Sequence, residues 1–150
     1  EAGLSVKQIS EQGLDIKIIS GDGFDTQLVS TVPGPELAND VYFSAHTYLG
    51  DDRPEVKKFI DDYKAEYGIE PENSFAPLGY DAVNLLADAI KRTDSAEPAK
   101  IREALAATRG FKAVTGEISY TRDTMVPPKP ISIVSVHGGD FKVEEIWLPK

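Results

Sequence analysis

A carboxylate between two glycines is the feature of this sequence best suited to chemistry. Residues 18–20 form a short run typical of a β-strand, and Gly21, Asp22 and Gly23 follow at once. Because glycine tolerates sharply turned backbone, we expect Asp22 to stand on an open turn at the carboxyl end of that strand. In α/β proteins, ligands bind at this edge of the sheet. A single carboxylate there predicts binding of a cationic group such as an ammonium.

The residues around Asp22 leave other roles open. Asp25 is expected to cap a helix that begins at Thr26, because a carboxylate accepts hydrogen bonds from the first turn of a helix. Asp22 could serve only to stabilise its own turn. Alternatively, Asp22 and Asp25 could form the metal-binding or phosphorylated pair of a flavodoxin-like phosphoacceptor domain. The sequence shows no glycine-rich phosphate loop, and no Ser/Thr and Lys clearly follow at further strand ends, which argues against this alternative.

Composition and charge limit the classes of function. The chain has 150 residues, of which 41% are hydrophobic, and a net charge of −9. This length suits one domain of ordinary size, and the negative charge repels nucleic acid, so no nucleic-acid partner is expected. Cysteine is absent, which excludes disulfides, thiolate catalysis and cysteine-bound metals. His46 and His137 lie far apart, and we expect them to be surface or half-buried polar residues rather than metal ligands.

The hydrophobic spacing predicts helices that alternate with strands early in the chain, and strands that dominate its end. Helices are expected from residue 2 to a cap at Gly13 and over 53–67, 75–92 and 98–108, and strands over 15–20, 41–45, 112–120, 131–136 and 141–148. The fold class is therefore α/β. The longest helix is expected to bury a stripe of Leu78, Ala82, Leu85, Leu86, Ala89 and Ile90.

Four motifs, in order and at suitable spacing, resemble the type I periplasmic binding proteins that deliver branched-chain and related amino acids to ABC transporters. They are EAG at 1–3, GDGFD at 21–25, SFAPLGYDA at 74–82 and VTGEI at 114–118. The resemblance runs end to end, but it matches only the C-terminal portion of such proteins, which are normally more than twice this long. It implies parts of two Rossmann-like lobes, each a three-layer α/β/α structure, that trap a ligand between them.

The resemblance also implies how the chain is divided. Residues 1–47 are expected to belong to the C-terminal lobe. Residues 48–128 would supply helices and the last strand of the N-terminal lobe, and residues 129–150 would return to the C-terminal lobe as a closing hairpin. The glycine-turn region with which the family grips a ligand carboxylate lies in a part of the pattern that is missing here.

Four residues are carried over from the family as ligand contacts. Asp22 occupies the acidic position that receives the α-ammonium of the ligand, a charge-assisted hydrogen bond. Phe75 corresponds to an aromatic that lies against the ligand side chain, with core packing as its alternative. Tyr80, one turn further along the same helix, could point into the cleft, although packing is favoured. Phe24 is expected to form a wall of the pocket.

The function implied is that of a non-enzymatic, cofactor-free binding component of an ABC transporter, with no catalytic or metal residues. The resemblance places it in the periplasm, or outside the cell on a lipid anchor in a Gram-positive source. Its expected partners are a small amino acid and the membrane permease. The chain begins at Glu1 without Met, which predicts a processed, truncated or engineered protein. Exposed apolar surface would then favour pairing with the missing N-terminal segment or a second copy of the chain, and a non-binding fragment is the alternative.

Overall fold

The computed structural model describes residues 1–121 and 126–148, and the chain divides into two compact units. The first unit comprises Glu1–Tyr48, Glu72–Ser74 and Ile131–Trp147. The second comprises Leu49–Pro71, Phe75–Pro130 and Leu148–Lys150. The parts of the expected lobe segments at 122–125 and 149–150 lie outside the described residues. The assignment of residues to the two expected lobes stays a prediction.

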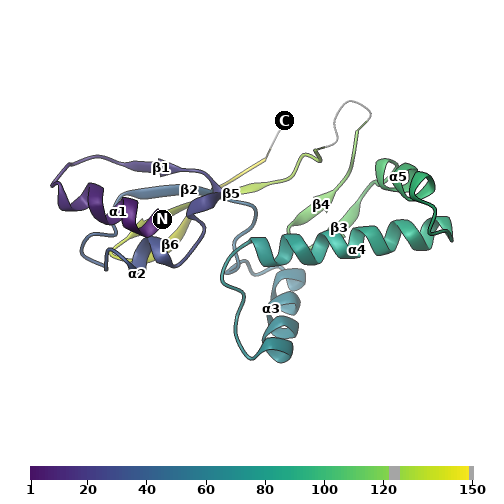
Figure 1. Ribbon diagram of the computed structural model, residues 1–150, viewed down its shortest axis with the longest axis horizontal. Helices are drawn as coiled ribbons and strands as arrows, with labels where there is room; N and C mark the ends of the chain where they lie inside the picture. The colour runs from purple at the N-terminus through teal and green to yellow at the C-terminus, as the bar shows by residue number, and fades with distance from the viewer. Residues whose placement is uncertain (122–125, 149–150) are drawn as a thin grey trace. The chain divides into compact units, whose positions relative to one another are not determined.

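A four-stranded sheet forms the centre of the first unit (Figure 1). Its strands are β1 (Ile18–Ser20), β2 (Val41–Ala45), β5 (Ile131–His137) and β6 (Asp140–Trp147), in the order β1-β2-β5-β6. β1 and β2 run parallel, whereas β5 is antiparallel to both β2 and β6. The parallel pair matters most for function, because it brings the carboxyl ends of β1 and β2 to the same edge of the sheet.

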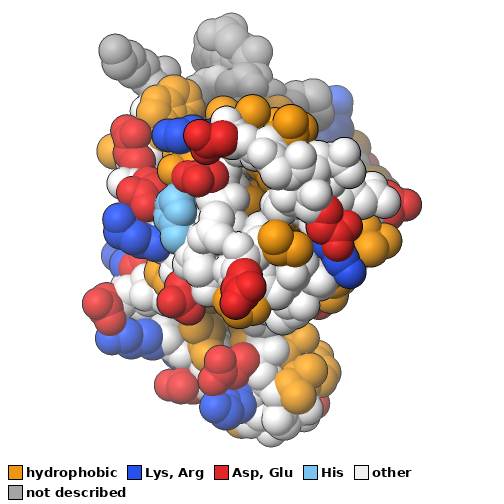
Figure 2. Space-filling view, turned by 90° about the vertical axis from the view of Figure 1, so that its left-hand side faces the viewer, with side chains coloured by type: hydrophobic (Ala, Val, Ile, Leu, Met, Phe, Trp, Pro, Cys, Tyr) orange, Lys and Arg blue, Asp and Glu red, His pale blue; other side chains and the backbone are white. Residues whose placement is uncertain are grey.

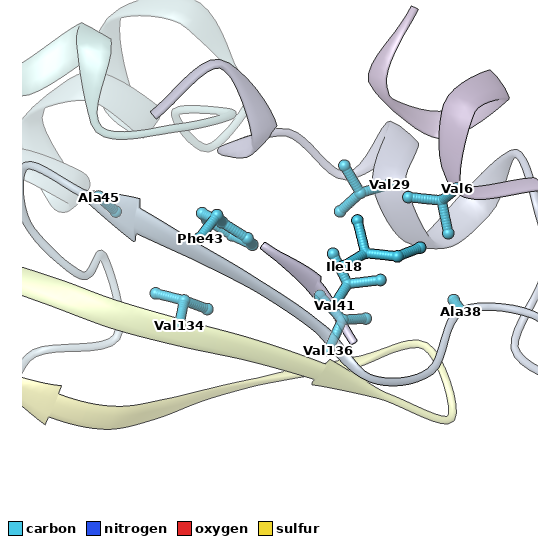
Figure 3. Packing of buried hydrophobic residues seen from close by; sticks show 9 residues of the cluster. All are labelled: Val6, Ile18, Val29, Ala38, Val41, Phe43, Ala45, Val134 and Val136. Atoms are coloured by element: carbon cyan, nitrogen blue, oxygen red, sulfur yellow. The ribbon is translucent and has the colours of Figure 1, made fainter. Parts of the chain in front are cut away.

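Helices α1 (Ala2–Glu11) and α2 (Leu28–Thr31) supply the apolar side chains that pack on this sheet. Figure 3 shows Val6 of α1 and Val29 of α2 beside the strand residues of the core. The two helices meet closely at Gly3, where an added Cβ would lie 2.0 Å from the carbonyl oxygen of Leu28. A glycine is therefore required at the third position of the EAG motif. The buried core consists of Val6, Ile18, Val29, Ala38, Val41, Phe43, Ala45, Val134 and Val136.

The described residues of the second unit form three helices and a two-stranded antiparallel sheet. The helices are α3 (Pro54–Tyr67), α4 (Phe75–Thr93) and α5 (Pro98–Ala106), and the strands are β3 (Phe111–Ala113) and β4 (Gly116–Ile118). α3 and α5 each begin with proline, whose fixed φ suits the first turn of a helix. Two small apolar clusters hold the unit together, one around Phe59 and one around Leu85.

Three expected elements differ most from the structure, and the helix expected over 98–108 is shorter by two residues. The helix expected from Thr26 is reduced to the four residues of α2, preceded by a 3-10 turn, η1 (Asp22–Phe24). The strand expected over 15–20 covers only 18–20. The strand expected over 112–120 is divided into β3 and β4 by a turn at Val114 and Thr115. Hydrogen bonds to that turn, described below, give the physical reason for the interruption.

The buried side of α4 is narrower than predicted. Its buried residues are Pro77, Asp81, Leu85 and Ala89, one per turn. Leu86 and Ile90, expected in the buried stripe, are 43% and 37% exposed, and Ala82 is exposed as well. The prediction was wrong for these three residues because the described parts of the second unit cover only one side of the helix. α4 thus carries a second apolar face that is open to solvent.

On one face of the molecule, charged residues are not gathered by sign. On the face drawn in Figure 2, acidic and basic side chains are interspersed, with hydrophobic side chains between them. Within residues 1–121 and 126–148, no helix combines the length and the apolar character needed to cross a membrane.

Candidate functional site

The candidate site begins where β1 and β2 end. The register pairs Ile18 with Val41 and Ser20 with Phe43. Since the strands are parallel, the segments that follow them leave the sheet at the same edge, where α/β proteins bind ligands. The first segment carries Asp22 and the second carries His46.

Asp22 is the first residue of η1 and stands on an open turn, as predicted. Neither neighbouring glycine adopts the left-handed backbone conformation that favours glycine. Gly21 has φ −86, and Gly23 does not have positive φ either. An added Cβ at either glycine would meet nothing within 4 Å. The two glycines therefore leave space around the carboxylate, which would allow another molecule to approach the backbone closely.

His46 is the residue that sequence reasoning missed at this edge. Its Nε2 lies 2.9 Å from Oδ2 of Asp22, within hydrogen-bond distance. Both side chains are partly exposed, 36% for His46 and 50% for Asp22. The prediction that His46 is a surface or half-buried polar residue agrees with its exposure but does not include its partner. The parallel pairing of 18–20 with 41–43 was the signal that could have identified this contact, and a single sequence does not reveal strand pairing directly.

Asp25 does not cap the helix as predicted. Its Oδ2 accepts hydrogen bonds from the backbone N–H of Ser74 at 2.8 Å and from the Ser74 hydroxyl at 2.5 Å. The N-cap position of α2 belongs to Gln27, which makes no side-chain capping bond. Thr26 adds a second link, because its hydroxyl donates to Glu72 at 2.9 Å. The turn that carries Asp22 is thereby held to residues 72–74. Ser74, the last residue of this segment, lies 49 residues after Asp25 in the sequence.

The predicted aromatic contacts have different surroundings. Phe24 is partly buried and packs against the core of the first unit. In the second unit, Phe75 at the start of α4 is 46% exposed. Tyr80 is 47% exposed and packs its ring against Phe59, with ring centroids 5.2 Å apart. Tyr80 also lines an open hollow of about 400 Å³ bounded by residues of α3, α4 and β3. None of these positions by itself identifies a ligand contact.

Asp81, which the sequence did not single out as a functional residue, organises the second unit. It is 3% exposed, and its carboxylate accepts hydrogen bonds from the N–H of Val114 at 2.9 Å and from the N–H of Thr115 at 2.8 Å. The Thr115 hydroxyl donates to the same carboxylate at 2.7 Å. Two of the motifs on which the family resemblance rests, GYDA and VTG, therefore meet through one buried acid.

Lys129 extends this cluster. Its Nζ donates to the Thr115 hydroxyl oxygen, which accepts that bond while donating its own proton to Asp81. Burial lowers the pKa of the Lys129 ammonium, and the negative charge of Asp81 opposes that shift. In contrast with Asp22, this acid has its hydrogen-bonding capacity occupied by the protein and is structural. Among the described residues, no group of three or more His, Cys, Asp or Glu side chains is arranged to hold a metal ion.

The carboxylate on an open turn beside a parallel strand pair is an arrangement typical of ligand-binding α/β proteins. Comparison with known proteins identifies the family to which this arrangement belongs. A family model described as periplasmic binding protein matches residues 1–140, and the chain belongs to that family. The resemblance inferred from the four motifs is thereby confirmed.

Individual relatives place the chain within that family. Leu/Ile/Val-binding protein homolog 1 of Brucella suis is 35% identical over 122 residues, which are 80% of this chain and 31% of the relative. The chain thus spans about a third of the length of the curated relatives it matches.

Solved structures agree with the assignment. The leucine binding protein LivK of Thermotoga maritima has a TM-score of 0.85 and 31% identity, and the match covers 99% of this chain and 42% of that one. The branched-chain amino acid transporter substrate binding protein LivJ of Streptococcus pneumoniae, solved in complex with isoleucine, has a TM-score of 0.83 and 33% identity, with the same coverage. The expected fold class, type I periplasmic binding protein, is confirmed.

Proposed function

We propose that this chain contributes to a binding protein that captures a branched-chain or related amino acid outside the cytoplasm and delivers it to an ABC transporter. The observation that carries the proposal is the match to the periplasmic binding protein family over residues 1–140. The names of its relatives support the choice of ligand, since they include a Leu/Ile/Val-binding homologue and a structure with isoleucine.

Asp22 is the residue that we propose receives the α-ammonium. Its carboxylate is half exposed at the carboxyl edge of the parallel strands, and the flanking glycines leave room for a ligand to approach. An ammonium supplies three N–H donors, which suit a carboxylate acceptor. The bond would be charge-assisted and would select amino acids over the corresponding carboxylic acids.

The aromatic residues have secondary parts in the proposal. We propose that Phe75, exposed at the start of α4, contacts the ligand side chain. Phe24 and Tyr80 are retained as weaker candidates, because each already packs within its own unit. Tyr80 in particular packs on Phe59, in keeping with the structural role favoured for it.

The proposal also covers catalysis, cellular location and the partners of the protein. A binding role requires no catalysis, and we propose none for this chain. The family description supports a place in the periplasm, or on the outer surface of a cell that has no periplasm. The proposed partners are the membrane permease of the transporter and, because the chain spans about a third of its curated relatives, an N-terminal segment or a second copy of the chain.

Calorimetric titration with isoleucine and with 3-methylpentanoate, which is isoleucine without its amino group, tests the proposal. The protein is used as its gene encodes it, including any segment outside these 150 residues. We expect isoleucine to bind and 3-methylpentanoate to bind far more weakly. Asp22→Asn should weaken isoleucine binding by about 30-fold or more, because truncating one partner of a hydrogen-bonded charge pair costs at least about 2 kcal/mol.

A matched control is Asp52→Asn, which changes a carboxylate that is 96% exposed on the second unit. It should leave the affinity for isoleucine unchanged. Equal binding of isoleucine and 3-methylpentanoate, or an Asp22→Asn variant with unaltered affinity, would contradict the proposed role of Asp22. Absence of binding to leucine, isoleucine and valine alike would contradict the proposed function.

A further inference from the structure

We infer that His46 is a positioning residue of the ammonium site, which orients the Asp22 carboxylate for its ligand. The inference rests on the proposed function of Asp22. His46 follows directly after β2, whereas Asp22 lies two residues beyond the last residue of β1. Because these strands are parallel neighbours, the fold itself brings the imidazole beside the carboxylate, with Nε2 2.9 Å from Oδ2.

The contact engages one half of the carboxylate. Among the residues that the structure describes, the Asp22 side chain bonds to His46 through Oδ2, and its other oxygen, Oδ1, is left for a ligand. A neutral imidazole with its proton on Nε2 donates to Oδ2 without cancelling the negative charge. An ammonium can therefore still pair with the carboxylate through Oδ1.

Positioning matters here because of the turn that carries Asp22. The side chain is 50% exposed, and neither flanking glycine has a side chain to restrict it. Without the imidazole, the carboxylate would rotate freely and would lose that freedom on binding, which weakens affinity. The hydrogen bond to His46 removes part of this entropy loss before the ligand arrives.

The second histidine of the chain gives a natural contrast. His137 ends β5, which is antiparallel to β2 and pairs its Val136 with Val41, the first residue of β2. His137 therefore lies at the opposite edge of the sheet from His46. It also has an aspartate beside it, since Nδ1 lies 4.0 Å from Oδ1 of Asp40. A histidine–aspartate pair alone therefore does not distinguish the proposed site. The distinguishing feature is that the His46–Asp22 pair lies at the carboxyl edge of the parallel strands.

The test compares three single variants, and one of them again in the Asp22→Asn background, by calorimetric titration of the protein as its gene encodes it. His46→Ala should weaken isoleucine binding by about fivefold, the value of one ordinary hydrogen bond of about 1 kcal/mol. His46→Gln should restore most of the affinity, because a glutamine amide can donate from a position near that of Nε2. His137→Ala should leave the affinity unchanged. In the Asp22→Asn background, His46→Ala should have little further effect, because the two residues act as a unit.

A spectroscopic measurement separates positioning from a general structural role. In ¹H–¹⁵N spectra of the imidazole nitrogens, His46 should carry its proton on Nε2, and Asp22→Asn should alter that signature while leaving His137 unaffected. Full affinity in His46→Ala, while Asp22→Asn still binds weakly, would overturn the inference and leave the proposed function intact. An unchanged His46 signature in Asp22→Asn would also overturn it. Absence of amino-acid binding by the unaltered protein would overturn both the inference and the proposed function.

Discussion

The two acids Asp22 and Asp81 show how the surroundings of a carboxylate decide its role. Asp22 is half exposed and bonds through one oxygen to a histidine, so it retains capacity for another donor. Asp81 is buried and accepts three hydrogen bonds from two neighbouring residues of a turn. Both belong to motifs shared with the family, but only Asp22 has the accessibility that a ligand requires.

We predict that Asp81→Asn loosens the turn between β3 and β4. An asparagine side chain has a single acceptor oxygen, and its amide would oppose at least one of the N–H donors of Val114 and Thr115. Leaving a buried donor unsatisfied costs about 1–3 kcal/mol. Amide hydrogen exchange should therefore speed up at Val114 and Thr115. The surface variant Asp88→Asn, which affects only a partly exposed pair with Arg92, should leave both exchange rates unchanged. Equal protection in the Asp81→Asn protein would show that the carboxylate is not what holds this turn.

At the scale of elements, local patterns predicted the long helices and the closing hairpin well. α3 and α4 agree with the predicted ranges to within one residue at each end, because their apolar spacing and proline or glycine boundaries are local signals. β5 and β6 likewise follow the alternating runs on either side of the Gly138-Gly139 turn.

The errors arise where contacts distant in the sequence decide the structure. The sequence predicts that Asp25 caps the next helix, but the Asp25 carboxylate accepts hydrogen bonds from Ser74, 49 residues away. The sequence predicts one strand where the structure has β3 and β4. The turn between them is held by Asp81, which lies 33 residues before Val114. The contact of Asp22 with His46 depends on which strands pair. Local propensity contains none of this information. The sequence therefore predicts Asp22 on a turn at the end of a strand, but it does not predict the contact of Asp22 with His46.

The contact between α1 and α2 leads to a prediction for Gly3. Gly3→Ala should destabilise the first unit by about 1–3 kcal/mol, because the new methyl group would overlap the Leu28 carbonyl and the Val32 side chain and force the helices apart. Urea unfolding followed by the fluorescence of Trp147, which lies in the same unit, measures the loss.

Gly79→Ala is the matched control for this change. Gly79 lies within α4, and an added Cβ there meets nothing within 4 Å. Alanine is favoured over glycine in a helix by about 1 kcal/mol, so the control should stabilise α4 and raise the midpoint of thermal unfolding measured by circular dichroism. A Gly3→Ala protein as stable as the unaltered one would mean that α1 and α2 do not approach as closely as the structure has them.

At the scale of the whole molecule, the open apolar face of α4 is the main unexplained feature. Val83, Leu86 and Ile90 are 68%, 43% and 37% exposed, and their spacing places them on one side of the helix. Large contiguous apolar patches mark interaction surfaces in soluble proteins, which makes this face a candidate for one. The chain also spans only 42% of the solved LivK and LivJ structures, so a large part of those proteins has no counterpart here.

We predict that the 150-residue chain alone associates with itself through this face. Burial of large aliphatic side chains contributes about 25 cal/mol for each Å² removed from water, which favours pairing over exposure. Sedimentation velocity should show a mass that rises with concentration. The double variant Val83→Lys with Leu86→Lys should raise the dissociation constant more than tenfold, because two positive charges on the same side of the helix would repel one another and would be costly to bury.

Lys91→Gln tests whether charge on the same helix, rather than the apolar face, controls association. Lys91 lies in the last turn of α4 and is exposed, so this substitution should leave the sedimentation profile unchanged. An N-terminal portion of a family member, added as a separate chain, should compete with self-association if it covers the same residues. A chain that stays monomeric at every concentration, and whose Leu86 and Ile90 remain accessible to solvent in the presence of that portion, would exclude the α4 face as an interaction surface.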